Sequence, residues 1–297
     1  MAIKKQDKVF QDLHRILESQ EFKSKEDVRK FMDGLMGKPI PSFPKESLTI
    51  KEHAQDLIFE AIELPDDDGY QLALKALQLD SDCIEAYEYL GSLEPIFETA
   101  ILYYKNGIDI AKRIYAKTHF KDGIGNFWMI HETRPFMRCM QALADCLRHM
   151  NRFHDAISIY EEMIRLNPND NQGVRNQLLL YLLRINDYNK FIKYDKLYKD
   201  DLGAFPSFNR ALFAFKTLGS SPRSIGILQH AAESNKHVIT KLLMKTISDE
   251  FPEGYGMGDE NEAKYYCFFA HEIWHETKGA IDWIRKNLKA SGLRAVK

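Results

Sequence analysis

The pattern with the clearest chemical potential in this 297-residue chain is HEIWH at positions 271–275. On a helix this spacing places two imidazoles one turn apart on the same face, where they can bind zinc while the glutamate acts as a general base. A zinc hydrolase also needs a third protein ligand, and the metzincin glycine and histidine positions hold Lys278 and Ile281 here. We therefore expect no catalytic residue, metal or cofactor, and keep a zinc-dependent hydrolase with His271 and His275 as ligands as the alternative.

A second dense group of polar residues is His131-Glu132-Thr133-Arg134-Pro135. His131 and Glu132 have the types of an acid–base pair, and Arg134 is suited to bind an anion. A structural explanation is stronger, because Thr133 can cap a helix that has Pro135 in its first turn, and Glu132 can pair with Arg134 or Arg138. We expect His131 and Arg134 to contact a ligand or to support the fold.

The elements that carry these residues are predicted to be helices throughout. Apolar residues recur with helical spacing, and no stretch alternates for long enough to indicate a sheet. Cap patterns at Ser24–Asp27, Thr49–Glu52 and Asp259–Glu262 predict helix starts. Gly37 predicts a helix end, and the prolines of 38–45 predict an extended linker. The fold class is therefore all-α.

The main body carries a repeat. From Met137 the sequence fits the 34-residue tetratricopeptide pattern, with Ala144 and Ala156 at the small positions where two antiparallel helices meet and Pro168 at the close. Weaker copies lie at 76–91, 174–199 and 208–219, and a long helix over about 97–116 breaks their register. This periodicity predicts a tetratricopeptide-like solenoid, a right-handed superhelix of helix pairs. The predicted domains are a helical segment and linker at 1–46, a repeat domain at 47–290 and a tail at 291–297.

The phase of the repeat predicts a binding groove. In this architecture, particular positions of the first helix in each pair face the concave side. Counting from Met137 assigns ten side chains to these positions: Arg138, Gln141, Asp145, Arg148, Gln172, Arg175, Asn176, Asn209, Phe213 and Lys216. Of these, we predict that the binding groove uses Arg138, Gln141, Arg175, Asn209 and Lys216. Guanidinium forks together with amide groups suit a carboxylate or an acidic peptide. The alternative is an ordinary solvated helix face with local ion pairs.

Composition narrows the function classes further. The 41 basic and 43 acidic residues leave a net charge of −2, which gives no global signature of nucleic-acid or membrane binding. No apolar run approaches the ~20 residues of a membrane span, and the first residues lack the apolar core of a signal peptide. Four cysteines without a CxxC pair fit free thiols in a reducing compartment. We expect a cytoplasmic protein with a protein or peptide partner; its oligomeric state is not predicted.

Several phrases resemble one known family. NFWMIHETRPFMR (126–138), LNPNDNQGVR (166–175), NKHVITKLLM (235–244) and the segment 258–284 are similar to the helical-repeat proteins of the suppression-of-tumorigenicity-seven family and its bacterial relatives. The resemblance covers about residues 54–284. It implies a tetratricopeptide-like solenoid closed by a terminal helical pair, and it implies no chemistry. Pattern and resemblance together predict a non-enzymatic scaffold or adaptor that binds its partner in the concave groove.

Overall fold

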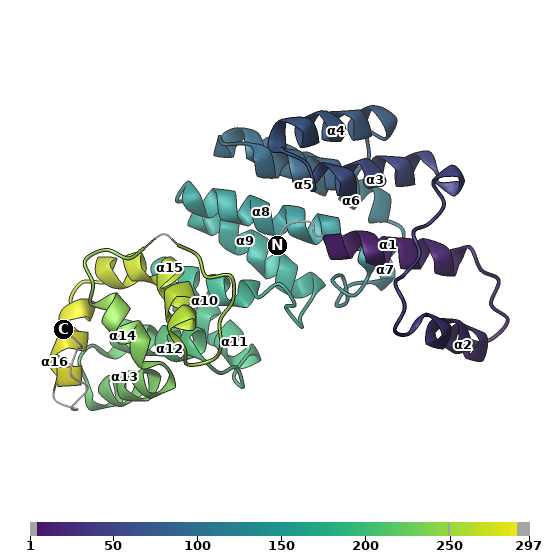
Figure 1. The fold of residues 1–297 in the computed structure, drawn as a ribbon. Coiled ribbons are helices and arrows are strands. Elements are labelled where there is room, and N and C mark those ends of the chain that lie inside the picture. Colours follow the sequence, from purple (N-terminus) through teal and green to yellow (C-terminus); the bar gives the residue numbers. More distant parts are fainter. Residues whose placement is uncertain (1–4, 249, 290–297) are drawn as a thin grey trace. The chain divides into compact units, whose positions relative to one another are not determined.

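The computed structural model describes residues 5–248 and 250–289 (Figure 1). This part of the chain folds into sixteen α-helices and two short 3-10 helices, with no strand among the residues described. The predicted all-α class is confirmed. Of the helices described, none combines the length and the apolar character that crossing a membrane requires.

The chain divides into two compact units, Met1–Gln172 and Gly173–Lys297. The boundary falls inside the range 47–290 that the sequence analysis treats as one repeat domain, and the two helices expected as a separate segment at 1–46 belong to the first unit. The predicted tail, 291–297, lies outside the described residues. We describe each unit by itself.

The first unit contains helices α1 to α9 and both 3-10 helices. The bounds are α1 Lys5–Glu18, α2 Lys25–Leu35, η1 Lys45–Ser47, α3 Ile50–Ala61, α4 Asp66–Leu79, α5 Ile84–Leu93, α6 Phe97–Tyr115, α7 His119–Asp122, η2 His131–Thr133, α8 Arg134–His149 and α9 Phe153–Leu166. Helices α3 and α4, α5 and α6, and α8 and α9 pack as successive pairs (Figure 1). The long helix expected at about 97–116 is α6.

Small residues allow these helices to approach closely. Ala61, Ala73 and Ala76 are fully buried between α3 and α4. A Cβ on Gly91 of α5 would lie 2.6 Å from the Tyr104 ring of α6, so only a glycine fits against that ring without movement. Protein interiors are close-packed, so the helix faces that meet in these contacts are not accessible to a ligand.

The pair α8–α9 corresponds to the repeat that the sequence predicts most clearly. Ala144 and Ala156 are both fully buried, as expected for the small positions of that pattern. The two helices are joined by a short turn in which Asn151 adopts a left-handed conformation, with φ of 58°. Asparagine tolerates this region better than most residues, which explains its presence at the turn.

The second unit contains helices α10 to α16. The bounds are α10 Val174–Arg184, α11 Tyr188–Leu197, α12 Ala204–Leu218, α13 Pro222–Ser234, α14 Lys236–Leu242, α15 Glu260–Glu276 and α16 Ala280–Lys289. Neighbouring helices again pack in pairs, α10 with α11, α12 with α13 and α14 with α15. The buried Glu262 carboxylate links three elements by accepting hydrogen bonds from the Ala204 amide, the Asn235 side chain and the Gly258 amide at 2.7–2.9 Å.

Three of the four predicted N-terminal helix caps form as expected, and the fourth does not. Thr49 and Glu52 form the complete capping box, Ser24 caps α2, and Asp259 caps α15. Thr133 precedes α8 as expected, but its hydroxyl makes no cap hydrogen bond and donates to the carbonyls of Phe127 and Ile130 instead. That part of the prediction is wrong, because a preceding tight turn offers carbonyl acceptors within reach of the side chain.

Candidate functional site

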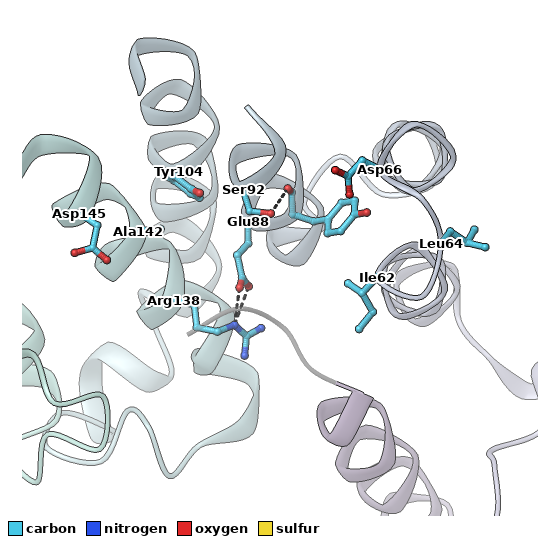
Figure 2. Close-up of a pocket in the computed structure, with 10 residues that line it drawn as sticks. Ile62, Leu64, Asp66, Glu88, Ser92, Tyr104, Arg138, Ala142 and Asp145 are labelled. Carbon is cyan, nitrogen blue, oxygen red and sulfur yellow. Dashed lines mark hydrogen bonds and ion pairs between the residues drawn. The ribbon is translucent and has the colours of Figure 1, made fainter. Parts of the chain in front are cut away.

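A pocket of about 320 Å³ opens on one face of the first unit (Figure 2). Its walls come mainly from the end of α3, from α5 and α8, and from Tyr104 of α6. The lining residues are Ile62, Leu64, Asp66, Glu88, Tyr89, Ser92, Tyr104, Arg138, Ala142 and Asp145. We call the surface that includes this pocket and the adjoining side chains Glu52, Asp56 and Glu85 the α3–α5–α8 face.

A buried ion pair lies at the centre of the pocket wall. The Arg138 Nε donates to both carboxylate oxygens of Glu88, at 2.8 and 2.9 Å, and the two residues are only 6% and 5% exposed. Figure 2 shows the Glu88 carboxylate pointing across from α5 to the guanidinium on α8. Burial raises the pKa of Glu88 to about 7, although Arg138 opposes that rise. The pocket therefore holds a group that titrates near neutral pH.

The other charged groups of the pocket are acidic. Asp145 accepts a hydrogen bond from the Tyr160 hydroxyl at 3.2 Å, and burial raises the pKa of its carboxyl. Asp66 lines the same pocket at the start of α4. Asp66, Glu88 and Asp145 outnumber Arg138 in the lining, but Glu88 is paired with Arg138 and Asp145 also lies 3.8 Å from Arg148, so the excess of negative charge in the pocket is small.

Two of the five predicted groove residues lie in this first unit. Arg138 lines the pocket and is engaged by Glu88, as described above. Gln141, one turn further along α8, accepts a hydrogen bond from the Gln172 side chain at 2.8 Å and does not line the pocket. The repeat phase thus places Arg138 on a pocket wall, but with an acidic partner already bonded to it.

The other three predicted residues lie in the second unit. Arg175 pairs with Asp201 and stacks over the Tyr198 ring at 5.1 Å. Asn209 is 1% exposed and accepts a hydrogen bond from the Tyr266 hydroxyl at 3.3 Å, so it has no surface through which a partner could reach it. Lys216 donates to Thr277 at 3.4 Å, and burial lowers its pKa.

His131 and Arg134 line a mainly apolar hollow of about 480 Å³ beside α1 and α2. Arg134 donates to the Trp128 carbonyl at 3.0 Å and lies over that ring. Glu132 pairs with His14 of α1 at 2.7 Å, which differs from the expected pairing with Arg134 or Arg138. The difference arises because α1, far away in sequence, packs beside the turn that carries Glu132.

The HEIWH side chains engage other parts of the second unit. The rings of His271 and His275 stack with centroids 4.1 Å apart, and their Nε2 atoms bond to the Met244 and Leu242 carbonyls at 2.9 and 3.0 Å. Glu272 forms an ion pair with Arg184 at 2.6 Å. Within residues 5–248 and 250–289, no group of three or more His, Cys, Asp or Glu side chains is arranged to hold a metal ion.

Glu88 is the residue of the pocket that sequence reasoning missed. It falls inside the weaker copy of the repeat predicted at 76–91, and an acid in a helix is usually solvent-exposed. Its partner Arg138 is fifty positions away. The available signal was that both lie at groove-facing positions of the repeat, Arg138 at the second position of its copy and Glu88 at the fifth of the other.

Comparison of the chain with models of known protein families finds no match, and comparison with curated proteins also finds none. The resemblance to the suppression-of-tumorigenicity-seven family therefore stays a prediction.

Proposed function

We propose that this chain is a non-enzymatic, tetratricopeptide-like helical-repeat protein that binds a segment of a protein partner on the α3–α5–α8 face. The observation that carries the proposal is the 320 Å³ pocket, whose walls are built mainly by α5 and α8, the first helices of two successive pairs, together with the turn between α3 and α4 and Tyr104 of α6. A surface assembled from equivalent helices of adjacent pairs suits an extended or helical segment, and repeat folds characteristically bind in this way.

The proposal is supported by the character of the pocket. Charged and hydroxyl groups make up about half of the lining and alternate with apolar and aromatic side chains, so the pocket offers polar contacts that can fix the orientation of a ligand. The buried Glu88–Arg138 pair gives that wall a defined charge pattern, because its geometry is held by two hydrogen bonds.

Filling the pocket tests the proposal. Ala142 lines the pocket and is half-exposed, so Ala142→Arg should block it with little effect on the fold. Asn106→Arg on the exposed side of α6 is the matched control. A protein captured from native lysate by the wild-type chain and the Asn106→Arg variant should be lost with Ala142→Arg. Retention of the same protein by all three chains would place its binding elsewhere and refute the proposal.

The partner chemistry expected from the sequence, an acidic or carboxylate-bearing group, stays a separate hypothesis with Arg175 as its most accessible carrier. An acidic partner would have to compete with Glu88 for Arg138 and with Asp201 for Arg175. If Arg175 binds a carboxylate, Arg175→Ala should weaken binding about tenfold and Arg175→Lys should restore part of the loss, because an ammonium lacks the planar fork. Equal affinity of all three chains for a captured partner would remove this hypothesis.

The zinc-hydrolase alternative requires rearrangement of the HEIWH side chains. Coordination through Nε2 would break the bonds of His271 and His275 to backbone carbonyls, and a free general base would require Glu272 to leave Arg184. We expect the untagged protein to contain no stoichiometric zinc and His271→Ala to leave the metal content unchanged. One zinc per chain that is lost in His271→Ala would favour the hydrolase.

A further inference from the structure

The residues that helix α1 buries most deeply against the first unit are charged. Between residues 8 and 18, Asp12 and Arg15 are the only buried residues, while Val9 and Phe10 are 43% and 52% exposed. An ordinary surface helix buries an apolar stripe instead. Leu13, Ile16 and Leu17 are half-buried, so specific ion pairs hold α1 together with an apolar face that is only partly buried.

Arg15 is the centre of this attachment. Its guanidinium lies 2.7 Å from the Asp56 carboxylate and 3.2 Å from that of Glu52, both on α3, and it donates to the Glu52 carbonyl at 3.3 Å. Lys8, two helical turns earlier on α1, lies 3.1 Å from the same Asp56 carboxylate. Two basic residues seven positions apart thus point from one face of α1 to one acidic patch.

The acidic patch continues into the pocket. Gln55, between Glu52 and Asp56 on α3, donates to Glu85 of α5 at 3.0 Å. Glu85 precedes Glu88 by three positions on that helix, so both lie on its same side. The surface that α1 covers and the pocket are therefore neighbouring parts of the α3–α5–α8 face.

We propose that the acidic part of the α3–α5–α8 face is a docking site for a basic helix of a protein partner, and that α1 is its exchangeable intramolecular occupant. The partner helix carries two basic residues seven positions apart on one face, as Lys8 and Arg15 do in α1. This inference deepens the proposed function and rests on it for the existence of a partner.

Exchange is feasible because of how α1 is held. The Lys8–Asp56 pair, whose lysine is 28% exposed, contributes little net free energy, and the buried Arg15 pairs gain only what remains after desolvation of both charges. This helix also fully buries no apolar side chain between residues 8 and 18. A tethered segment nevertheless acts at an effective concentration of order millimolar. The apparent affinity of a partner helix is therefore its intrinsic affinity multiplied by the fraction of chains in which α1 is undocked.

A fluorescent peptide with the sequence of residues 5–20 tests the docking site without any partner. The protein is the full chain, either wild-type or with Arg15→Glu, which releases α1. Arg29→Glu on α2, whose side chain is 76% exposed, is the matched charge-reversal control. We expect the peptide to bind Arg15→Glu at least about tenfold more tightly than wild type or the control, because the site is then vacant. Lys8→Glu, a milder release at a side chain that is 28% exposed, should give a smaller increase.

A charge exchange identifies the site. Asp56→Arg in the chain that keeps Arg15 should release α1 by charge repulsion and abolish binding of the wild-type peptide, whereas a peptide carrying Arg15→Glu should bind this variant. Equal peptide affinity for Arg15→Glu, Arg29→Glu and wild type, or binding unaffected by Asp56→Arg, would overturn the inference. Since these assays contain no partner, they can fail while Ala142→Arg still abolishes partner capture, and the two proposals are thus tested separately.

Discussion

Replacing Glu88 with glutamine should remove a pH dependence from the stability of the first unit. Burial raises the pKa of Glu88 to about 7 from an ordinary value of 4.5. An acid with a raised folded-state pKa stabilises the fold fully below its unfolded-state pKa, and this contribution is lost as the pH rises through the folded-state value. At 1.36 kcal/mol per pH unit, the free energy of unfolding of the wild-type chain should lose about 3 kcal/mol from this group between pH 4.5 and 7.

Glutamine keeps the shape of the side chain and an acceptor for Arg138 but does not titrate in this range. Urea unfolding of wild type and Glu88→Gln, followed by circular dichroism at pH 5, 6, 7 and 8, measures the difference. The stability of the wild-type chain relative to the variant should fall steadily up to about pH 7 and then level off. Parallel profiles for the two chains would show that Glu88 remains an ordinary carboxylate and would refute the reasoning.

Arg138→Met provides the complementary test. Because Arg138 opposes the rise of the Glu88 pKa, its removal should extend the loss of stability beyond pH 7. Breaking a buried pair by removing one partner typically costs about 3–5 kcal/mol, and protonation of Glu88 should reduce this cost at low pH. A variant that is equally destabilised at pH 5 and pH 8 would contradict the assignment of the penalty to an unpaired carboxylate.

Three further outcomes are expected. Gly91→Ala should destabilise the chain by about 1–3 kcal/mol in thermal or urea unfolding, because its Cβ would meet the Tyr104 ring at 2.6 Å; unchanged stability would mean that this packing is loose. Ala156→Leu should cost about the same by overpacking the fully buried α8–α9 seam, and a parent-like melting temperature would contradict the repeat phase. His14, whose pKa is raised by its bond to Glu132 against the opposing effect of burial, should hold α1 more firmly at pH 6 than at pH 8. Amide exchange of α1, corrected for its intrinsic pH dependence, should show this difference in wild type and not in His14→Gln.

Local features of the fold were predictable from the sequence. The caps at Ser24, Thr49 and Asp259 depend on side chains within three positions of the helix start, so their residue types are sufficient to identify them. The small residues Ala144 and Ala156 were likewise identified by a pattern within one repeat. Such signals are local in the chain and need no knowledge of tertiary structure.

The candidate site was less predictable because its interactions are long-range. Glu88 and Arg138 are fifty positions apart, and Arg15 meets Asp56 across forty-one. Repeat phase indicated that Arg138 faces a binding surface but carried no information on which acid would pair with it. For Asn209, the same phase predicted an accessible side chain, whereas Tyr266 of α15 covers it.

The most direct test of the central claim, that the α3–α5–α8 face binds the partner, is amide hydrogen exchange of the full chain with and without a captured partner. Binding there should slow exchange in α5 and α8, around Glu88 and Arg138, and speed it in α1 as that helix is displaced. Protection confined to the second unit, with α1 and α5 unchanged, would contradict the account.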